Sequence, residues 1–247
     1  MPYREKRIYS GKYLEVEIYS ITKKERNMKR KKKERESLVK QKNLNDKNAK
    51  KHLIRLINTN FSDKDLAVHL TYDNKNLPSS EEEARKDVGN FLRRLKGYRK
   101  RRGLPELKYI AVIEYKDQEE GKTIRIHHHI IMDGVLDRDT VESIWKKGRA
   151  NADRLKADEF GYEAIARYIT KDPKGKKRWT QSKNLKQPVI KINDHKYSRR
   201  KVYELFKEKG NAREFEDLYP GYIYTHSETP INDITGTAVY IKMRKLE

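Results

Sequence analysis

The chain has 247 residues, of which 35% are hydrophobic and 39% charged, a length that fits one large domain or a domain with an extension. Its 59 Lys and Arg against 37 Asp and Glu leave a net charge of +22, which favours a polyanionic partner such as nucleic acid. The lack of cysteine excludes disulfides and thiolate zinc sites, and no apolar run is long enough for a signal sequence or a membrane span. We therefore expect a soluble cytoplasmic protein that has no membrane partner.

The first sixty residues combine a strand with a basic segment. Residues 13–21 alternate in polarity and predict a strand. Residues 22–51 are dense in Lys, Arg and Glu and indicate a basic helix, solvated or lying along an acidic partner; a disordered segment is the alternative. Leu53, Leu56 and Ile57 then follow at helical spacing and give a face that can pack on the main body.

The main body is expected to begin with residues 65–72 (DLAVHLTY), an alternating strand with aliphatic residues on one face and His69 and Thr71 on the other. Ser79 or Ser80, followed by EEEAR, then marks the start of a helix with acids in its first turn. The outer side of this helix and the loop after it are basic. A solvated face is one explanation of these charges, but the ending KRRG beside an aromatic residue favours contact with phosphates. The residues concerned are Arg93, Arg94, Tyr98, Arg99, Lys100, Arg101 and Arg102.

Three consecutive histidines lie inside an apolar, β-branched stretch, RIHHHIIMDG. In a strand, alternation sends His127 and His129 to one face and His128 to the other. The stretch YIAVIEYK predicts the preceding strand and DQEEGK a turn, so the hairpin places Glu114 beside His127. Two neutral imidazoles and one carboxylate would then form a candidate metal site. Histidines with a purely structural role are the alternative.

Two helices are expected after the hairpin. Residues 135–154 predict a helix that begins with acidic residues, and residues 161–171 predict another that ends before Asp172-Pro173. Tyr168 and Lys171 share a face of the second helix, although an aromatic residue beside an aliphatic stripe is more often part of a core.

The remaining chain is a basic, turn-rich connection containing Trp179, a helix at residues 199–210 and short strands such as GYIYTHS and GTAVYIKMRK. The order of elements predicts an α+β fold with an antiparallel sheet. We expect three regions: a strand with a basic helical extension (1–60), the core (61–180) and a segment that completes or flanks the core (181–247). No phosphate-cradling glycine motif is present, which excludes a fused ATP-driven helicase.

These residues resemble the HUH endonuclease superfamily, in particular the single-tyrosine rolling-circle replication initiators of plasmids and phages. LAVHLTY resembles the first, largely structural motif, and KYIAVIEY resembles the strand that supplies a carboxylate ligand. His127-His128-His129 resembles the HUH motif, although histidine is less common at its centre. The YITK stretch from Tyr168 to Lys171 resembles the third motif. The motifs are short, but their order and spacing agree over roughly residues 65–179.

The resemblance implies a central antiparallel sheet with helices packed on its faces (an HUH/RRM-like endonuclease fold) plus a basic helical N-terminal extension. It implies that Glu114, His127 and His129 hold Mn²⁺ or Mg²⁺, with Mn²⁺ the better match to two nitrogens. Tyr168 would attack a scissile phosphate of single-stranded DNA and leave a free 3′-OH and a 5′-phosphotyrosine, with Lys171 stabilising its anion.

The implied role is a replication initiator that nicks and rejoins DNA at an origin in the cytoplasm of a bacterial host cell, while a host helicase unwinds the duplex. Its partners would be single-stranded DNA and origin DNA, with Tyr98 and Trp179 stacking on bases. Tyr162 is the competing nucleophile. A relaxase or single-tyrosine transposase of the same superfamily is the nearest alternative, and a non-catalytic basic nucleic-acid-binding protein is the alternative from another class. The further candidate DNA contacts are Lys174, Lys176, Lys177, Arg178 and Trp179.

Overall fold

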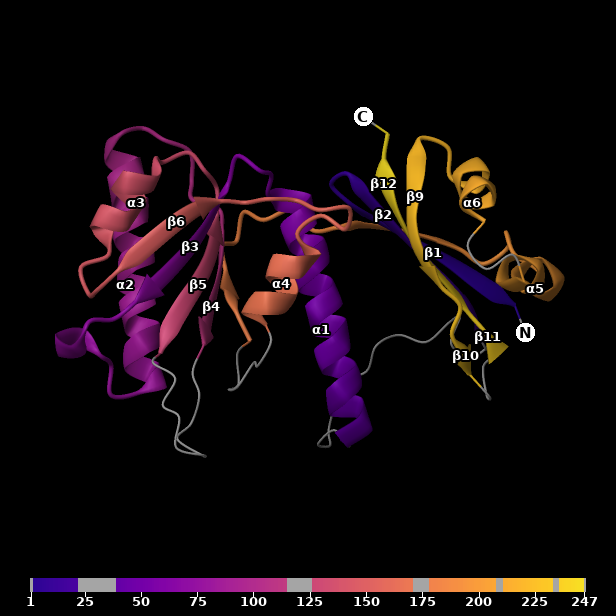
Figure 1. Cartoon of the computed structure of the whole chain (residues 1–247), viewed down its shortest axis with the longest axis horizontal. Coiled ribbons are helices and arrows are strands. Elements are labelled where there is room, and N and C mark those ends of the chain that lie inside the picture. The colour runs from indigo at the N-terminus through magenta and orange to yellow at the C-terminus, as the bar shows by residue number, and fades with distance from the viewer. Residues whose placement is uncertain are drawn as a thin grey trace. The chain divides into compact units, whose positions relative to one another are not determined.

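The computed structural model describes residues 2–21, 39–114, 126–170, 178–207, 211–232 and 236–246, without the side chains of 39–42, 206–207, 231–232 and 236. Within these residues the fold is α+β with antiparallel pairing, as the sequence predicted, and its strands form two five-stranded sheets and a two-stranded one (Figure 1). The chain divides into two compact units. Unit 1 comprises Met1–Thr59, Asp158–Gly161 and Gln187–Glu247, and unit 2 comprises Asn60–Ala157 and Tyr162–Lys186.

Unit 2 contains the predicted core strands and helices. Its sheet has the strand order β6-β3-β5-β4-β7. The elements, in chain order, are β3 (Leu66–Thr71), the short 3₁₀ helix η1 (Asn74–Asn76), α2 (Glu81–Arg101), β4 (Tyr109–Glu114), β5 (His127–Met132), α3 (Arg138–Ile144), β6 (Ala150–Arg154), α4 (Glu163–Ile169) and β7 (Thr180–Gln181).

One face of this sheet is apolar and covered by α2, while α4 lies on the other face (Figure 1). The strands contribute Leu70 and Ile130 to the core, and α2 contributes Phe91 and Leu95. The helix begins where the sequence predicted, because the Ser80 side chain accepts a hydrogen bond from the Glu83 backbone N–H and caps the first turn. The acidic first turn and basic last turn of α2 also complement the helix dipole.

The predicted helix over residues 135–154 is wrong in its second half. The helix α3 ends at Ile144, and residues 150–154 form β6, an edge strand that pairs with β3. Gly148 makes this change of direction possible: its φ is 153°, and an added Cβ would lie 2.5 Å from the Thr71 carbonyl oxygen. Backbone pairing to β3 continues there, since the Thr71 N–H donates to the Arg149 carbonyl at 2.9 Å.

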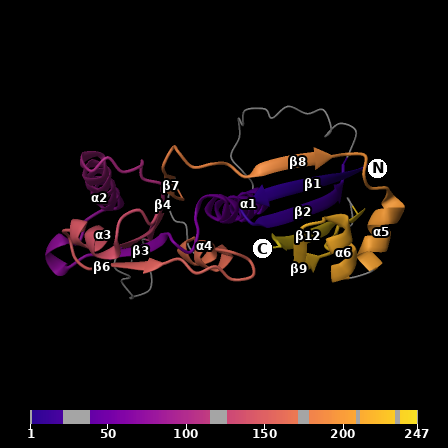
Figure 2. The same ribbon diagram turned by 90° about the horizontal axis from the view of Figure 1, so that it is seen from above.

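Unit 1 has its own antiparallel sheet, in the order β8-β1-β2-β12-β9, whose strands lie side by side in Figure 2. The N-terminal strands therefore pair with strands from the C-terminal third of the chain, and a two-stranded ribbon of β10 and β11 accompanies them. The elements are β1 (Tyr3–Ser10), β2 (Tyr13–Ser20), α1 (Val39–Asn60), β8 (Val189–Asn193), α5 (Arg199–Lys207), α6 (Ala212–Leu218), β9 (Tyr222–Glu228), β10 (Ile231–Asn232), β11 (Gly236–Thr237) and β12 (Val239–Lys245).

Unit 1 keeps its two sheet faces chemically different. Residues of α5 and α6 share a core with β2 and β12 on one face. On the other face, the α1 residue Arg55 donates to the Glu15 and Glu17 carboxylates at 2.6 and 2.9 Å. Leu53, Leu56 and Ile57 are fully buried, which confirms the packed helix face that the sequence predicted. Among the described residues, no helix has both the length and the apolar character that crossing a bilayer requires.

Two hydrogen bonds join the chain ends of unit 2. The Asn60 side-chain amide donates to the Lys186 carbonyl at 2.8 Å, and the Lys186 N–H donates back to the Asn60 Oδ1 at 2.8 Å. Asn60 and Lys186 are the first and last residues of the unit. The reciprocal bonds hold the entry and exit of the chain together.

A buried ion pair fixes the end of α2. Arg99 is 1% exposed, and its guanidinium donates to the Asp133 carboxylate at 2.6 Å and to the Pro105 carbonyl at 2.8 Å. Asp133 also accepts the Lys108 backbone N–H at 2.6 Å. The pair therefore connects α2, the loop after it and the turn that follows β5.

We expect Arg99→Gln to lower the free energy of unfolding by about 3 kcal/mol, because it leaves the largely buried Asp133 carboxylate without its cation. Urea denaturation followed by circular dichroism measures the change. Lys100→Gln, at an exposed neighbouring position, is the control and should change stability by less than about 0.5 kcal/mol. Equal effects of the two substitutions would contradict a structural role for the ion pair.

Candidate metal and tyrosine site

The three histidines lie on β5, which pairs with β3 on one side and β4 on the other. The register places Glu114 opposite His127 and places His69 opposite His129. Since side chains alternate across a strand, His127 and His129 point away from the α2 core, while His128 points into it. The predicted faces of the three histidines and the predicted neighbour of His127 are thus confirmed.

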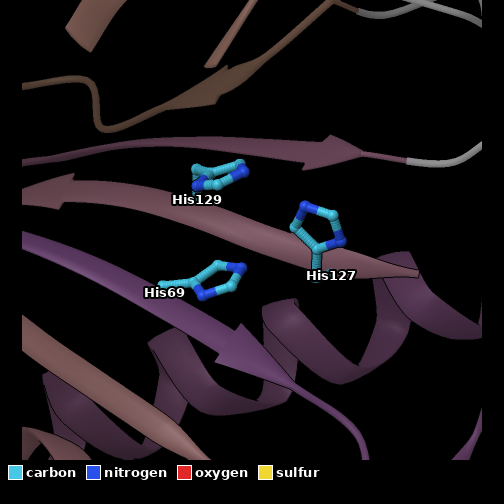
Figure 3. Close-up of side chains that lie close together, drawn as sticks. All are labelled: His69, His127 and His129. Atoms are coloured by element: carbon cyan, nitrogen blue, oxygen red, sulfur yellow. The ribbon is translucent and has the colours of Figure 1, made fainter. Parts of the chain in front are cut away.

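His69, His127 and His129 form a compact cluster on the face away from α2 (Figure 3). Each offers one ring nitrogen, and these nitrogens lie within 4.8 Å of one another. The His69 ring is stacked on that of His129 at 4.9 Å between centroids, and the His127 ring stands edge-on to both. Three imidazole nitrogens this close together could hold one metal ion.

Glu114 joins this cluster from β4. Its Oε2 lies 2.9 Å from the His127 Nε2 and 3.2 Å from the His129 Nε2. Burial alone would raise the pKa of the Glu114 carboxyl, but the two neighbouring imidazoles outweigh it and hold that pKa below its ordinary value. The carboxylate is therefore ionised at neutral pH and can act as an oxygen ligand.

Two of the cluster imidazoles, those of His69 and His129, are kept neutral by their surroundings. Burial lowers the pKa of His129 to about 4, and burial followed by the nearby His127 lowers that of His69. A neutral imidazole is the form that binds metal. The His69 Nε2 is buried and has no hydrogen-bond partner within the described chain, so a metal ion would satisfy it. This buried nitrogen without a hydrogen-bond partner is the strongest indication that the cluster is suited to a metal ion.

His128 has a different environment on the opposite face. It is fully buried and its Nε2 lies 2.7 Å from the Tyr72 hydroxyl, with the Trp145 ring close by. Burial lowers the pKa of His128 to about 3, so it stays neutral. The middle histidine packs and hydrogen-bonds within the core and cannot reach the cluster.

Tyr168 lies beside the histidine cluster. It belongs to the short helix α4, its side chain is 61% exposed, and its ring centroid is 5.2 Å from that of His129. A hollow of about 240 Å³ lies between α4 and the sheet, and Tyr168, His69 and His129 line it. An exposed phenol, a candidate metal-binding cluster and an adjoining hollow thus share one face of unit 2.

Tyr162, the competing candidate, is placed otherwise. It is 4% exposed, and its hydroxyl donates to the Asp63 carboxylate at 2.9 Å. It precedes α4 and anchors the start of that helix to the segment before β3.

The candidate DNA contacts lie elsewhere in unit 2. Arg93, Arg94, Lys100, Arg101 and Arg102 are exposed on or just after α2, whereas Arg99 is buried. Tyr98 is partly buried, with the Arg102 guanidinium 4.5 Å above its ring. Arg178 and Trp179 are partly buried just before β7. The candidates outside the described residues are Lys171, Lys174, Lys176 and Lys177.

Sequence reasoning missed His69 as a member of the cluster. The signal was present, because the alternating aliphatic residues of LAVHLTY send His69 to the face away from the core. What was lacking was the pairing partner of this strand, since β3 and β5 are far apart in the chain and no turn fixes their register.

The α+β unit thus brings potential metal ligands on an open sheet face together with an exposed tyrosine. Residues 65–173 match the family described as "Replication-associated protein ORF2/G2P". The match spans less than half of the chain but includes every residue of the cluster and Tyr168, and it supports a replication-initiator-like role. Neither the curated proteins nor the solved structures contain a match to this chain.

We expect His69→Ala to weaken Mn²⁺ binding by about 10-fold or more, because it removes one of three converging nitrogens. Isothermal titration calorimetry of the full chain near neutral pH measures this. His226→Ala, at a partly exposed histidine of unit 1, is the control. If His69→Ala binds Mn²⁺ like the wild type while Glu114→Gln does not, the ligands are instead the carboxylate and the two β5 imidazoles.

Proposed function

We propose that unit 2 nicks and rejoins single-stranded DNA at a replication origin, with Tyr168 as the nucleophile and a divalent metal held by the histidine cluster. The observation that carries the proposal is the exposed Tyr168 ring, 5.2 Å from the ring of His129. The match to a replication-associated family over the same residues supports it.

The metal would be held by His69, His127 and His129, with the Glu114 carboxylate as an additional ligand from β4. A mixed imidazole and carboxylate set suits Mn²⁺ or Mg²⁺, and the nitrogens favour Mn²⁺. When bound, the ion would polarise the scissile phosphate and stabilise the charge that develops on its oxygens. The ionised Glu114 and the neutral His69 and His129 are in the forms that this role needs.

Tyr168 would form the covalent link. Its phenolic oxygen attacks phosphorus, an O–P bond to tyrosine forms, and the bond from phosphorus to the 3′-oxygen breaks. The phenol gives its proton to solvent or to a nearby base, and the departing 3′-oxygen takes one up. The 5′-phosphotyrosine conserves the phosphoester bond, so a returning 3′-OH can reverse the reaction and rejoin the strand. Lys171, outside the described residues, would stabilise the phenolate as the sequence motif implies.

Two features favour Tyr168 over Tyr162 for this role. The Tyr168 side chain is 61% exposed beside the cluster, so a DNA strand can reach it without a rearrangement of the core. The Tyr162 hydroxyl is instead buried and already donates to Asp63. An attack by Tyr162 would require breaking this bond and unpacking the start of α4.

We also propose DNA contacts at the exposed cations of α2 and at Tyr98, Arg178 and Trp179. The α2 cations lie on the opposite side of the sheet from the cluster, so they would bind a part of the DNA other than the strand being cut. Arg99 is left out because its guanidinium is buried against Asp133. Lys174, Lys176 and Lys177 remain sequence-based candidates. The proposed setting is the cytoplasm of a bacterial host cell. A host helicase would unwind the duplex there, because this sequence has no nucleotide-binding motif with which to drive unwinding.

Labelled single-stranded DNA tests the chemistry. With Mn²⁺, we expect a denaturant-resistant adduct that keeps a label on the 3′ side of the nick and loses a label on its 5′ side. Tyr168→Phe should reduce this adduct by at least about 10³-fold, because the nucleophilic oxygen is removed. Gel electrophoresis under denaturing conditions measures both labels in one experiment.

Tyr162→Phe is the matched control, since it removes the other hydroxyl near α4, and it should retain adduct formation. An adduct that survives in Tyr168→Phe and disappears in Tyr162→Phe would reverse the assignment of the nucleophile. Metal-independent binding without any adduct in the wild type would instead identify a non-catalytic nucleic-acid-binding protein.

A further inference from the structure

The second half of α2 carries an uninterrupted positive charge. From Val88 to Pro105 the sequence has seven cations and no acidic residue. Arg99 is buried, and the other six side chains are exposed. No ion pair joins any of these six to a carboxylate in the described part of the chain. We call their surface the α2 ridge; its cations are Arg93, Arg94, Lys96, Lys100, Arg101 and Arg102.

The ridge is flanked by a hollow on each side. One hollow, of about 660 Å³, lies between α2, the loop after it and the segment following β7. The other, of about 440 Å³, lies between α2 and α3. Cations line both and outnumber acids. The first hollow has Lys96, Lys100 and Lys183 with one carboxylate, Glu106, and the second has Arg94, Arg101 and Lys146.

Two glycines lie on the outer line of the ridge, one on each side of Arg93. Gly89, Arg93 and Gly97 follow one another at four-residue spacing and so lie along one line of the helix. A Cβ on Gly89 would have nothing within 4 Å, and one on Gly97 only the flexible Arg101 guanidinium at 3.6 Å. Packing within the protein therefore does not require glycine at either position, although glycine disfavours a helix. A partner that approaches the helix backbone closely would require it.

The ridge and the histidine cluster lie on opposite sides of the unit 2 sheet. α2 packs on the face that contains Leu70 and His128, and the cluster lies on the other face. The ridge is the outer side of α2, so the sheet and the thickness of a helix, about 10 Å, separate it from the cluster. A DNA strand bound at the cluster cannot occupy the ridge at the same point.

We propose that the α2 ridge enters the major groove of a double-stranded DNA segment, with the phosphates of its two strands in the two flanking hollows. An α-helix is about 10–12 Å across, and the major groove of B-form DNA is about 12 Å wide. The paired rows of cations match the two phosphate backbones that border the groove. The choice of DNA as the polyanion rests on the proposed function, and the duplex site is separate from strand cutting.

This mode of binding would not accommodate duplex RNA. The major groove of A-form RNA is deep and narrow and does not admit a helix. Attraction of the ridge to any polyanion would not distinguish the two duplexes, whereas insertion of α2 would. The comparison of DNA and RNA duplexes is therefore the sharpest test of the mode of binding.

Fluorescence anisotropy of the full chain without metal tests the site, using a DNA duplex of about two helical turns, the matching RNA duplex and single-stranded DNA. Lys96→Gln/Arg101→Gln should weaken duplex DNA binding at least about 10-fold and reduce the salt slope by about 2. Lys64→Gln/Lys156→Gln removes two exposed charges elsewhere in unit 2 and is the matched control. Equal losses in the two double variants, or equal affinity for duplex RNA, would overturn the proposal.

A second variant tests the close approach without changing charge. Gly97→Leu should leave the melting temperature unchanged or higher, because leucine favours a helix, yet lower duplex DNA affinity by about 10-fold. Gly89→Leu provides a second such position. Unchanged duplex affinity in both variants would contradict insertion of the ridge.

The two proposals fail separately. Duplex binding without adduct formation on short single strands would count against the strand-cutting activity alone. If adducts still form but the ridge substitutions do not change duplex binding, the result would count against the α2 ridge proposal alone.

Discussion

The antiparallel pairing of β5 between β3 and β4 is the constraint on which the candidate site depends. It places one imidazole from β3, two from β5 and one carboxylate from β4 on a single face. A slip of one residue in this register would exchange His128 for its neighbours and bury the potential ligands in the α2 core. The hydrogen bond between His128 and Tyr72 and the packing of Ile130 both oppose that slip.

The charges on the two sides of this sheet are opposite in character. The cluster side presents an ionised Glu114 near the neutral imidazoles of His69 and His129, although the chain as a whole carries a net charge of +22. A DNA phosphate would be repelled by Glu114 unless a cation lay between them. The second half of α2, from Val88 to Arg101, presents cations without a carboxylate of its own and attracts phosphates directly. In the proposed function, binding of DNA and chemistry on DNA therefore fall on different faces of unit 2.

Local patterns in the sequence were sufficient to predict those parts of unit 2 that are determined by residues close together in the chain. The alternation of side chains along a strand predicted which face each of the three histidines occupies. The expected hairpin predicted that Glu114 lies beside His127, and Ser80 predicted the start of α2. Long-range pairing was not accessible in the same way. His69 reaches the cluster only because β3 pairs with β5, and β6 depends on Gly148 passing close to the end of β3. The pairing of N-terminal with C-terminal strands in unit 1 likewise has no local signature.

The reciprocal hydrogen bonds between Asn60 and Lys186 have a consequence for how such a protein can evolve. They bring the boundaries of unit 2 to one point, apart from the brief departure of Asp158–Gly161 into unit 1. A segment whose ends meet can be carried within a host sequence, or reopened at another loop, at little cost to its own folding. The histidine-bearing unit is therefore built like a cassette that recombination could move between proteins.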